Sequence, residues 1–164
     1  MKGHAIAAVV WIGLLGAGWY LVDRASDTTP AVRGCGDAGN GEIVLPVAAD
    51  GHFYVEGAVN GAPVRFVLDT GASNVTIGTD AAHAARLPAG LPAVFHTANG
   101  RVEGRLVPRQ QVRAACLEAN DITVAVSPGL GEMSLLGQNF LRRFEVVQTA
   151  RELRLRLRPA SPDP

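Results

Sequence analysis

One short segment of the chain has the residue types that peptide hydrolysis needs. Asp69, Thr70 and Gly71 follow the apolar run 66–68 and precede the small residue Ala72. A carboxylate at the end of a buried strand is held in place, and Gly71 allows a tight turn whose backbone amides approach it. Two carboxylates about 3 Å apart share one proton and together act as base and acid in hydrolysis. We therefore predict that Asp69 is catalytic and that Thr70, Gly71 and Ala72 support its loop.

The chain contains a single Asp-Thr-Gly sequence, although the chemistry needs two carboxylates. The other aspartates lack a following Thr/Ser-Gly; they are Asp23, Asp27, Asp37, Asp50, Asp80, Asp121 and Asp163. The second carboxylate must then come from a second copy of the chain, related to the first by a two-fold axis. We predict a homodimer to which each chain contributes Asp69.

Strands and tight turns are expected to position this segment. Asn60-Gly61 lies between the β-rich runs 52–59 and 62–68, and Asn99-Gly100 also lies between extended runs. Both dipeptides tolerate positive φ, so they predict two hairpins, the first leading directly to Asp69 and the second with its tip near Asn99. Further strands are expected at 43–47, 74–77, 107–116, 122–126 and 153–158, and short helices at 81–86 and 138–143.

Composition favours an all-β fold and excludes some classes of partner. Gly (19) and Pro (10) are plentiful and aromatic residues make up 5%, which suits a turn-rich β protein. The net charge is zero, so no electrostatic argument favours nucleic acid. The chain has no Cys-x-x-Cys and its four histidines are scattered, so we expect neither a metal site nor another cofactor.

In combination these features resemble the retropepsin-like aspartic proteases, most closely the bacterial single-domain members with an N-terminal membrane anchor. The resemblance covers residues 43–157 and is carried by GHFYVEGAVNG, VRFVLDTGAS, HTANG and LLGQNFL. It implies a single acid-protease barrel over 43–158 with one or two short helices. It also implies that Asp69 is catalytic and that the protein acts on protein or peptide substrates.

The resemblance assigns roles to two further segments. The hairpin around Thr97, Ala98, Asn99 and Gly100 would be a flap over the substrate, and Leu135, Leu136 and Gly137 would brace the active-site loop. Thr70 would reach the loop of the partner chain. In related dimers the chain termini pair at the interface, which would give the strand 153–158 a function. Asn139, Arg142 and Arg143 are interpreted as the surface of the short helix.

The N-terminal segment 5–22 carries no charged residue and would span roughly 27 Å as a helix. It is interpreted as an uncleaved membrane anchor that contacts the lipid bilayer, with a cleaved signal peptide as the alternative. Lys2 favours a cytoplasmic N-terminus, which gives a single-pass inner-membrane protein with a periplasmic protease domain. Residues 1–22 would then be the anchor, 23–42 a linker and 159–164 a disordered tail. Such an anchor suggests envelope or membrane-proximal proteins as substrates.

Several alternatives remain open from sequence alone. Cys35 and Cys116 form a disulfide in an oxidising compartment or remain two unrelated thiols. The arginines of the alternating strand 153–158 are solvated, or they face lipid headgroups or a partner chain. The same barrel could be a catalytically inactive binding or scaffold module at the membrane. A different hydrolase would use Cys116 or Ser73 with His52, His83 or His96, but no nucleophile elbow surrounds them.

Overall fold

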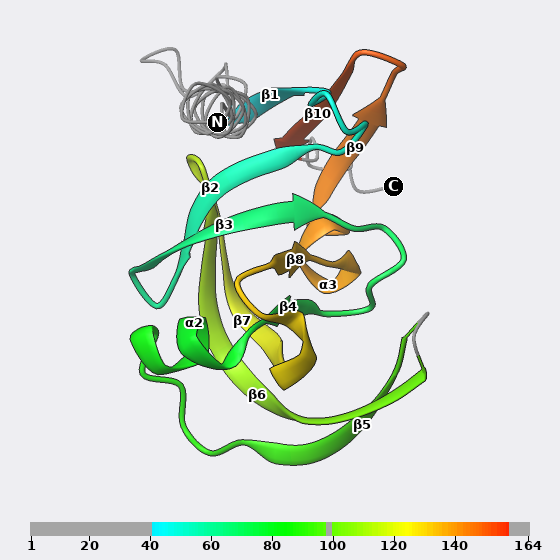
Figure 1. Cartoon of the computed structure of the whole chain (residues 1–164). Helices are drawn as coiled ribbons and strands as arrows, with labels where there is room; N and C mark the ends of the chain where they lie inside the picture. Colours follow the sequence, from blue (N-terminus) through cyan, green and yellow to red (C-terminus); the bar gives the residue numbers. More distant parts are fainter. Residues whose placement is uncertain (1–40, 98–99, 158–164) are drawn as a thin grey trace, which may run out of the picture.

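Strands predominate in residues 41–97 and 100–157, the part of the chain that the computed structural model describes (Figure 1). The strands are Glu42–Pro46 (β1), Tyr54–Val59 (β2), Ala62–Leu68 (β3), Val75–Ile77 (β4), Leu91–Thr97 (β5), Gly100–Ala114 (β6), Leu117–Val126 (β7), Ser134–Leu136 (β8), Phe144–Gln148 (β9) and Glu152–Leu157 (β10). Between them lie the helices Thr79–Ala84 (α2) and Gln138–Leu141 (α3) and the 3₁₀ turn Pro128–Leu130 (η1). The predicted mostly β fold with short helices is confirmed.

The larger sheet closes into a barrel. Its strand order is β2-β3-β8-β4-β7-β6, and β6 pairs back onto β2, with β5 attached outside the ring as the hairpin partner of β6. Closure brings Gly57 opposite Ala114. A Cβ atom at position 57 would lie 2.0 Å from the carbonyl oxygen of Arg113, so only glycine fits at this approach. The ring therefore has no free edge at which another strand could add.

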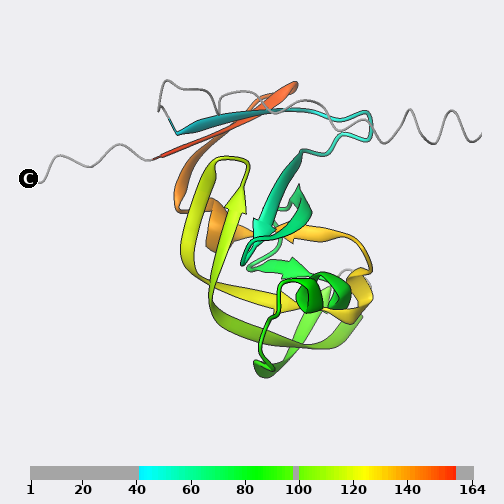
Figure 2. The ribbon, with the colours of Figure 1, turned by 90° about the vertical axis from the view of Figure 1, so that its left-hand side faces the viewer.

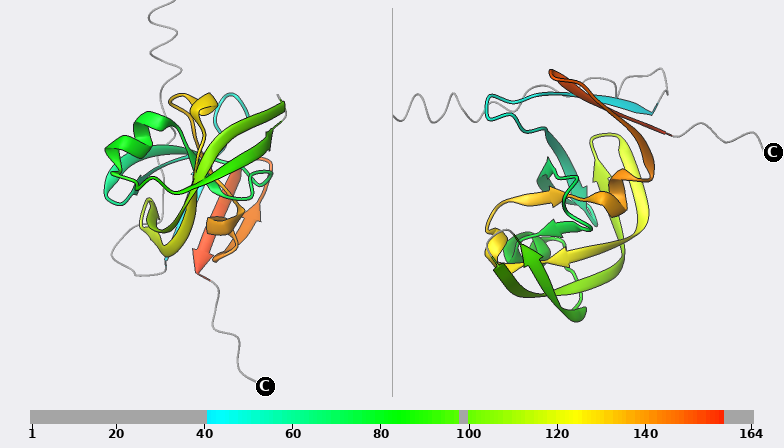
Figure 3. Two further views of the ribbon diagram at one scale, coloured as in Figure 1. Left: turned by 90° about the horizontal axis from the view of Figure 1, so that it is seen from below. Right: turned by 90° about the vertical axis from the view of Figure 1, so that its right-hand side faces the viewer.

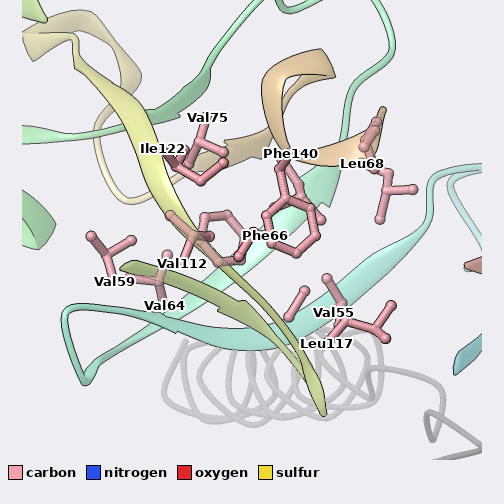
Figure 4. Packing of buried hydrophobic residues seen from close by; sticks show 14 of the residues in the cluster. Val55, Val59, Val64, Phe66, Leu68, Val75, Val112, Leu117, Ile122 and Phe140 are labelled. Carbon is pink, nitrogen blue, oxygen red and sulfur yellow. The ribbon is translucent and has the colours of Figure 1, made fainter. Parts of the chain in front are cut away.

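Alternating apolar side chains fill the barrel and fix the strand that leads to the active-site loop. In β3 the side chains of Val64, Phe66 and Leu68 are buried and the residues between them are more exposed. Figure 4 shows these residues with others from β2, β4, β6, β7 and α3 pointing into one core, among them Phe140. Because a one-residue slip would expose all three β3 side chains, the register of β3 is strongly specified.

Both predicted hairpins form. Asn60 and Gly61 have φ of 49° and 83° in the turn between β2 and β3, as a two-residue hairpin requires. In the second hairpin, β5 and β6 pair down to Thr97 opposite Gly100, and the Thr97 hydroxyl donates to the Gly100 carbonyl at 2.9 Å. The remaining predicted tip residues, Ala98 and Asn99, lie outside the described residues.

The strand β6 is longer than the sequence predicted. The sequence suggested a strand that begins at Val107, but β6 runs unbroken from Gly100 through Pro108. Its ladder with β7 shifts register on both sides of Gln110, and Arg109 on β6 and Asp121 on β7 have φ near 60°. These two bulges, one on each strand, bend the pair without ending it. Residues 107–111 therefore form a corner where the flap hairpin leaves the barrel.

A second sheet, in the order β1-β10-β9, lies at one end of the barrel, and the flap hairpin lies at the other end (Figures 2 and 3). The strand expected to serve a dimer interface, 153–158, is β10 in the middle of this sheet, so it has no free edge. In the described part of the chain the edge strands of this sheet are β1 and β9, and β9 was not predicted.

The arginines of β10 are paired within this sheet. Arg154 contacts Glu42 at 3.2 Å and Glu152 at 2.7 Å, and Arg156 makes two hydrogen bonds to Glu145 at 2.8 and 2.9 Å. The alternating strand therefore has a face of matched charges on the side away from the core. Such a face has little free positive charge to offer to lipid phosphates.

Some expectations lie outside the described residues, namely the anchor 1–22, most of the linker 23–42, and the tail 159–164. Glu42, placed in the linker, belongs to β1. None of the helices in residues 41–97 and 100–157 is long and apolar enough to cross a bilayer. The first helix begins at Thr79 rather than near Ala81, after an extended Gly78.

Candidate active site

Asp69 lies immediately after β3, at the point where two parallel strands end together. β3 and β8 pair in parallel up to Leu68 opposite Leu136, and the Asp69 N–H donates to the Leu136 carbonyl at 3.2 Å. The ladder thus extends one residue beyond β3. Asp69 is half-buried and Thr70 is exposed, so the carboxylate lies at the rim of the barrel on a fixed backbone.

The turn after Asp69 folds its backbone onto the carboxylate. The Gly71 N–H donates to Asp69 Oδ1 at 2.8 Å, and the Ala72 N–H donates to the Asp69 carbonyl at 3.3 Å. A Cβ at position 71 would lie 3.2 Å from Oδ1, a tight contact that glycine avoids. Asp69 Oδ2 accepts no hydrogen bond from residues 41–97 or 100–157, so it is available to a water molecule, a substrate or a second carboxyl group.

The predicted bracing segment lies directly against this loop. The N–H of Gln138 donates to the Ala72 carbonyl at 2.8 Å, and that of Asn139 donates to the Ser73 carbonyl at 3.1 Å. These are the first amides of α3, which have no partner within a helix. A Cβ at Gly137 would lie 2.2 Å from the Asn74 carbonyl oxygen, so glycine is required for the two loops to touch.

Asn139 is a supporting residue that the sequence analysis misplaced on the helix surface. Its Oδ1 accepts from the Val75 N–H at 2.8 Å, and its Nδ2 donates to the Thr123 carbonyl at 2.7 Å and to Asn74 Oδ1 at 3.2 Å. One side chain thus joins α3, β7 and the strand that follows the active-site loop. The signal that could have identified this residue is an amide side chain close to the apolar-Gly sequence. A residue exposed on the helix surface has no need of an amide.

Thr70 faces a cavity of about 590 Å³ beside the active-site loop. The cavity is lined by Thr70, Gln138, Leu141, Arg142, Phe144, Glu145 and Val146, and so extends from the loop to β9. Gln138 Nε2 donates to the Thr70 carbonyl at 3.1 Å, whereas the Thr70 hydroxyl bonds to no residue in the described part of the chain. The predicted role of Thr70 toward a partner chain remains a prediction.

The flap hairpin presents an apolar and a polar face. Phe95 is paired with Val102, and Gly104 is packed so closely that a Cβ there would lie 2.6 Å from the Phe95 ring. The alternate positions His96 and Arg101 are exposed on the opposite face. The apolar face packs toward the barrel, because a Cβ at Gly129 in η1 would lie 3.9 Å from Val102.

The alternative of a Cys- or Ser-dependent hydrolase finds no support. Cys116, in the two-residue turn between β6 and β7, is disulfide-bonded and therefore has no thiolate to act as a nucleophile. Its expected partner, Cys35, lies outside the described residues, and their pairing stays a prediction. Ser73 makes no hydrogen bond to any histidine among residues 41–97 and 100–157.

No group of three or more His, Cys, Asp or Glu side chains in the described ranges is arranged to hold a metal ion. His52, the histidine nearest in sequence to the barrel's first hairpin, contacts Asp50 at 3.4 Å on the surface.

A closed barrel, an Asp-Thr-Gly loop braced by an apolar-Gly segment and a hairpin flap together define a retropepsin-like aspartic protease. A crystal structure of a retropepsin-like aspartic protease from Rickettsia conorii superposes with a TM-score of 0.59 and 27% sequence identity. The match covers 71% of this chain and 91% of that protein. The family model for the gag-polyprotein putative aspartyl protease matches residues 55–143, and the chain belongs to this family.

Two curated relatives are also similar to this chain. An uncharacterised protein encoded in the cobV 5′ region of a Sinorhizobium species is 35% identical over 123 residues, covering 72% of this chain. An uncharacterised protein of Rickettsia prowazekii (strain Madrid E) is 29% identical over 116 residues, covering 69%. The matches span 53% and 50% of these proteins, so the chain spans about half the length of the relatives it matches.

Proposed function

We propose that this protein is an aspartic endopeptidase that is active as a homodimer, with one Asp69 from each chain. The observation that carries the proposal is the placement of Asp69. Its backbone is fixed by the β8 ladder, Oδ1 is held by the Gly71 N–H, and Oδ2 is left available. The described chain offers one such carboxylate, and general acid–base hydrolysis of a peptide needs two.

In this mechanism the two Asp69 side chains share one proton and hold a water molecule between them. The ionised carboxylate takes a proton from the water as its oxygen attacks the peptide carbonyl carbon, and the protonated carboxyl group donates its proton to the carbonyl oxygen. The proton taken from water then passes to the leaving nitrogen as the C–N bond breaks. The Gly71 N–H donates to Oδ1 and fixes the orientation of its own carboxylate.

The partner chain is proposed to dock at β9 and the adjoining cavity. Among residues 41–97 and 100–157, β9 is an edge strand whose Val146 and Val147 are 37% and 42% exposed, and an apolar edge strand readily pairs with another strand. Val146 and Thr70 line the same cavity, so a two-fold axis near the active-site loops also passes near β9. An antiparallel β9–β9 pair satisfies two-fold symmetry, because each strand then contacts the same strand of its partner.

Substrate and location are proposed from the sequence. The uncharged segment 5–22 supports attachment to the inner membrane with the catalytic domain in the periplasm. An enzyme held there acts on envelope or membrane-proximal proteins.

The test measures cleavage of an unstructured protein by the purified full chain in detergent, with and without a statine-type transition-state analogue. We expect Asp69→Asn to abolish turnover while the chain keeps its fold. Asp80→Asn is the matched control, because Asp80 is an exposed carboxylate on α2. The rate should rise more steeply than linearly with chain concentration when most chains are unpaired.

Cleavage that survives both Asp69→Asn and the analogue would overturn the aspartic-protease proposal. A folded wild-type chain that binds peptides without cutting them would indicate the inactive binding module. A strictly linear dependence of rate on concentration, with monomers in sedimentation, would overturn the homodimer.

A further inference from the structure

Asn60 does more than form the turn between β2 and β3. Its N–H donates to the Gln111 carbonyl at 3.0 Å, and its Oδ1 accepts from the Gln111 N–H at 3.1 Å. Its Nδ2 donates to Gln110 Oε1 at 2.7 Å and to the Ala85 carbonyl at 3.4 Å. The first hairpin is thus fastened through one side chain to the corner of β6 and to the end of α2.

Gln110 is a buried polar residue, 7% exposed, placed at the register shift that bends β6. Its Oε1 accepts from Asn60, and its Nε2 donates to the Pro108 carbonyl at 2.5 Å. Both ends of the amide are therefore satisfied, as burial demands. A hydrophobic residue would fill the same space without the free-energy cost of burying a polar group. The amide therefore has a role beyond filling the core.

The corner connects the strand that leads to Asp69 with the strand that carries the flap hairpin. From Asn60, β3 runs to Asp69; from Gln110, β6 runs back to the flap end at Gly100. At about 3.3 Å per residue each arm is roughly 30 Å long. Figure 1 shows both arms extending from the side of the molecule near α2 toward the opposite side. The two arms therefore diverge from the Asn60–Gln110 contact.

A small change of angle at this contact produces a large displacement at the far ends of the two arms. A rotation of about 5° over an arm of roughly 30 Å moves its end by about 2.6 Å. A misplacement of about 1 Å in an active site can reduce the rate about 100-fold. The backbone is bulged at Arg109 and Asp121, with φ of 62° and 60°, so the regular ladder is interrupted there. The angle of the corner therefore depends on side-chain contacts.

We propose that Asn60 and Gln110 are positioning residues, which together set the angle between the flap hairpin and the strand that carries Asp69. Neither residue touches the site, and both act through the geometry of the β6 corner. The catalytic consequence of this inference rests on the proposed protease function, whereas the effect on the flap does not.

Two variants remove the contact while leaving the fold intact. Gln110→Met keeps the side-chain volume and removes both amide bonds. Asn60→Gly suits the positive φ of 49° and keeps the backbone bond to Gln111. Gln111→Ala is the matched control, because its side chain bonds Glu118 on the exposed side of the same corner. All are made in the full chain.

The first measurement is hydrogen exchange of backbone amides, which needs no activity. We expect exchange across residues 91–106 to quicken about tenfold in Gln110→Met and Asn60→Gly relative to Gln111→Ala, and by more than any rise that lost stability causes in the β3 amides. The effect of the double variant should be smaller than the sum of the two single effects, because the Asn60–Gln110 bond is lost in both. Unchanged exchange in 91–106, or an equal rise in Gln111→Ala, would overturn the inference.

The second measurement is steady-state cleavage. We expect kcat/KM to fall about ten- to a hundredfold in both variants with the self-association constant unchanged. Normal kcat/KM beside quickened flap exchange would overturn the positioning role. If the wild-type chain cleaves nothing, the proposed function fails, and the exchange experiment still decides whether the contact holds the flap.

Discussion

Asn139 accepts a hydrogen bond from the Val75 N–H at 2.8 Å although 64 positions separate the two residues. Val75 begins the strand that leaves the active-site loop, and Asn139 lies in the helix that follows the bracing segment. The same side chain also reaches β7 through the Thr123 carbonyl. The position of Asp69 therefore depends on an amide that is distant in sequence and is not part of the Asp-Thr-Gly motif.

Replacing Asn139 with Leu should destabilise the fold and the loop together. The change leaves the Val75 N–H and the Thr123 carbonyl without partners, which corresponds to a loss of about 2–4 kcal/mol. Urea unfolding followed by circular dichroism measures it. Arg143→Ala, an exposed change at the end of the same helix, should cost less than about 0.5 kcal/mol. Equal losses in the two variants would contradict the role given to Asn139.

Gly137→Ala should be among the most damaging single methyl additions in the chain. The new Cβ would lie 2.2 Å from the Asn74 carbonyl and 2.8 Å from that of Ala72, both backbone atoms. The active-site loop would have to move, and we expect at least about 3 kcal/mol of lost stability. Gly129→Ala is the control, since its nearest neighbour would be 3.9 Å away. A well-folded, fully active Gly137→Ala protein would refute the close contact.

Val146→Lys should weaken self-association. The variant places a charge on the β9 edge and beside the cavity that reaches Thr70, where the partner chain is proposed to dock. Sedimentation velocity should show at least a tenfold weaker dimer, because a buried unpaired charge costs several kcal/mol. Val94→Lys changes a comparably exposed valine on β5 and should leave the dimer intact. The docking face would be misassigned if only Val94→Lys dissociated the dimer.

Thr70→Val should separate stability of the monomer from formation of the dimer. The Thr70 hydroxyl has no hydrogen-bond partner among residues 41–97 and 100–157, so the denaturation midpoint of dilute, unpaired chains should stay within about 0.5 kcal/mol of wild type. A hydroxyl that bonds the partner's loop would instead lower dimer affinity several-fold when lost. Thr76→Val is the comparison, because Thr76 bonds the Asn74 carbonyl within its own chain. A dimer unaffected by Thr70→Val would exclude the bridging role.

The Tyr54–Asp50 pair predicts a pH-dependent contribution to stability. The Tyr54 hydroxyl donates to Asp50 and holds the pKa of that carboxyl below its ordinary 3.8, with the His52 N–H adding to the effect. The same bond raises the pKa of Tyr54 above 10.0. The contribution of Asp50 is therefore present above pH 3.8 and is lost as pH falls further, and that of Tyr54 is lost above pH 10.

Tyr54→Phe should accordingly be less stable than wild type at pH 6 and equally stable near pH 2 in urea unfolding. The exposed position of the pair makes the difference small. In an Asp50→Asn background the same change should have little further effect. A deficit that persists unchanged at low pH would show that the bond to Asp50 is not its cause, because the Phe ring still packs against Arg65 as the Tyr54 ring does, 4.6 Å away.

Much of this fold was predictable because its signals are local. Asn60-Gly61 and the β-rich run 62–68 determine backbone geometry within a few residues, and the hairpin that they form was predicted correctly. The Asp-Thr-Gly loop belongs to the same class, because each of its residues acts on its immediate neighbours. Sequence patterns of this kind need no knowledge of which segments meet.

What the sequence did not reveal depends on contacts between distant segments. The unbroken run of β6 through Pro108 depends on paired bulges in two strands, and β9 depends on β10, which folds back to cover it. Asn139 and Gln110 look like surface amides until Val75 and Asn60 are placed beside them. The order of strands in the small sheet, with β10 between β1 and β9, could not be predicted either, because it depends on which distant segments pair.

The pairing of Glu42 with Arg156 puts the first and last strands of the described chain side by side, in the sheet away from the flap. Anything attached before β1 or after β10 therefore starts from the same end of the molecule. The paired strands β1 and β10 and the flap hairpin therefore lie at opposite ends of the domain. A bead, a surface or another protein attached at either terminus would hold the molecule with the flap hairpin facing the solvent, where a substrate can reach it.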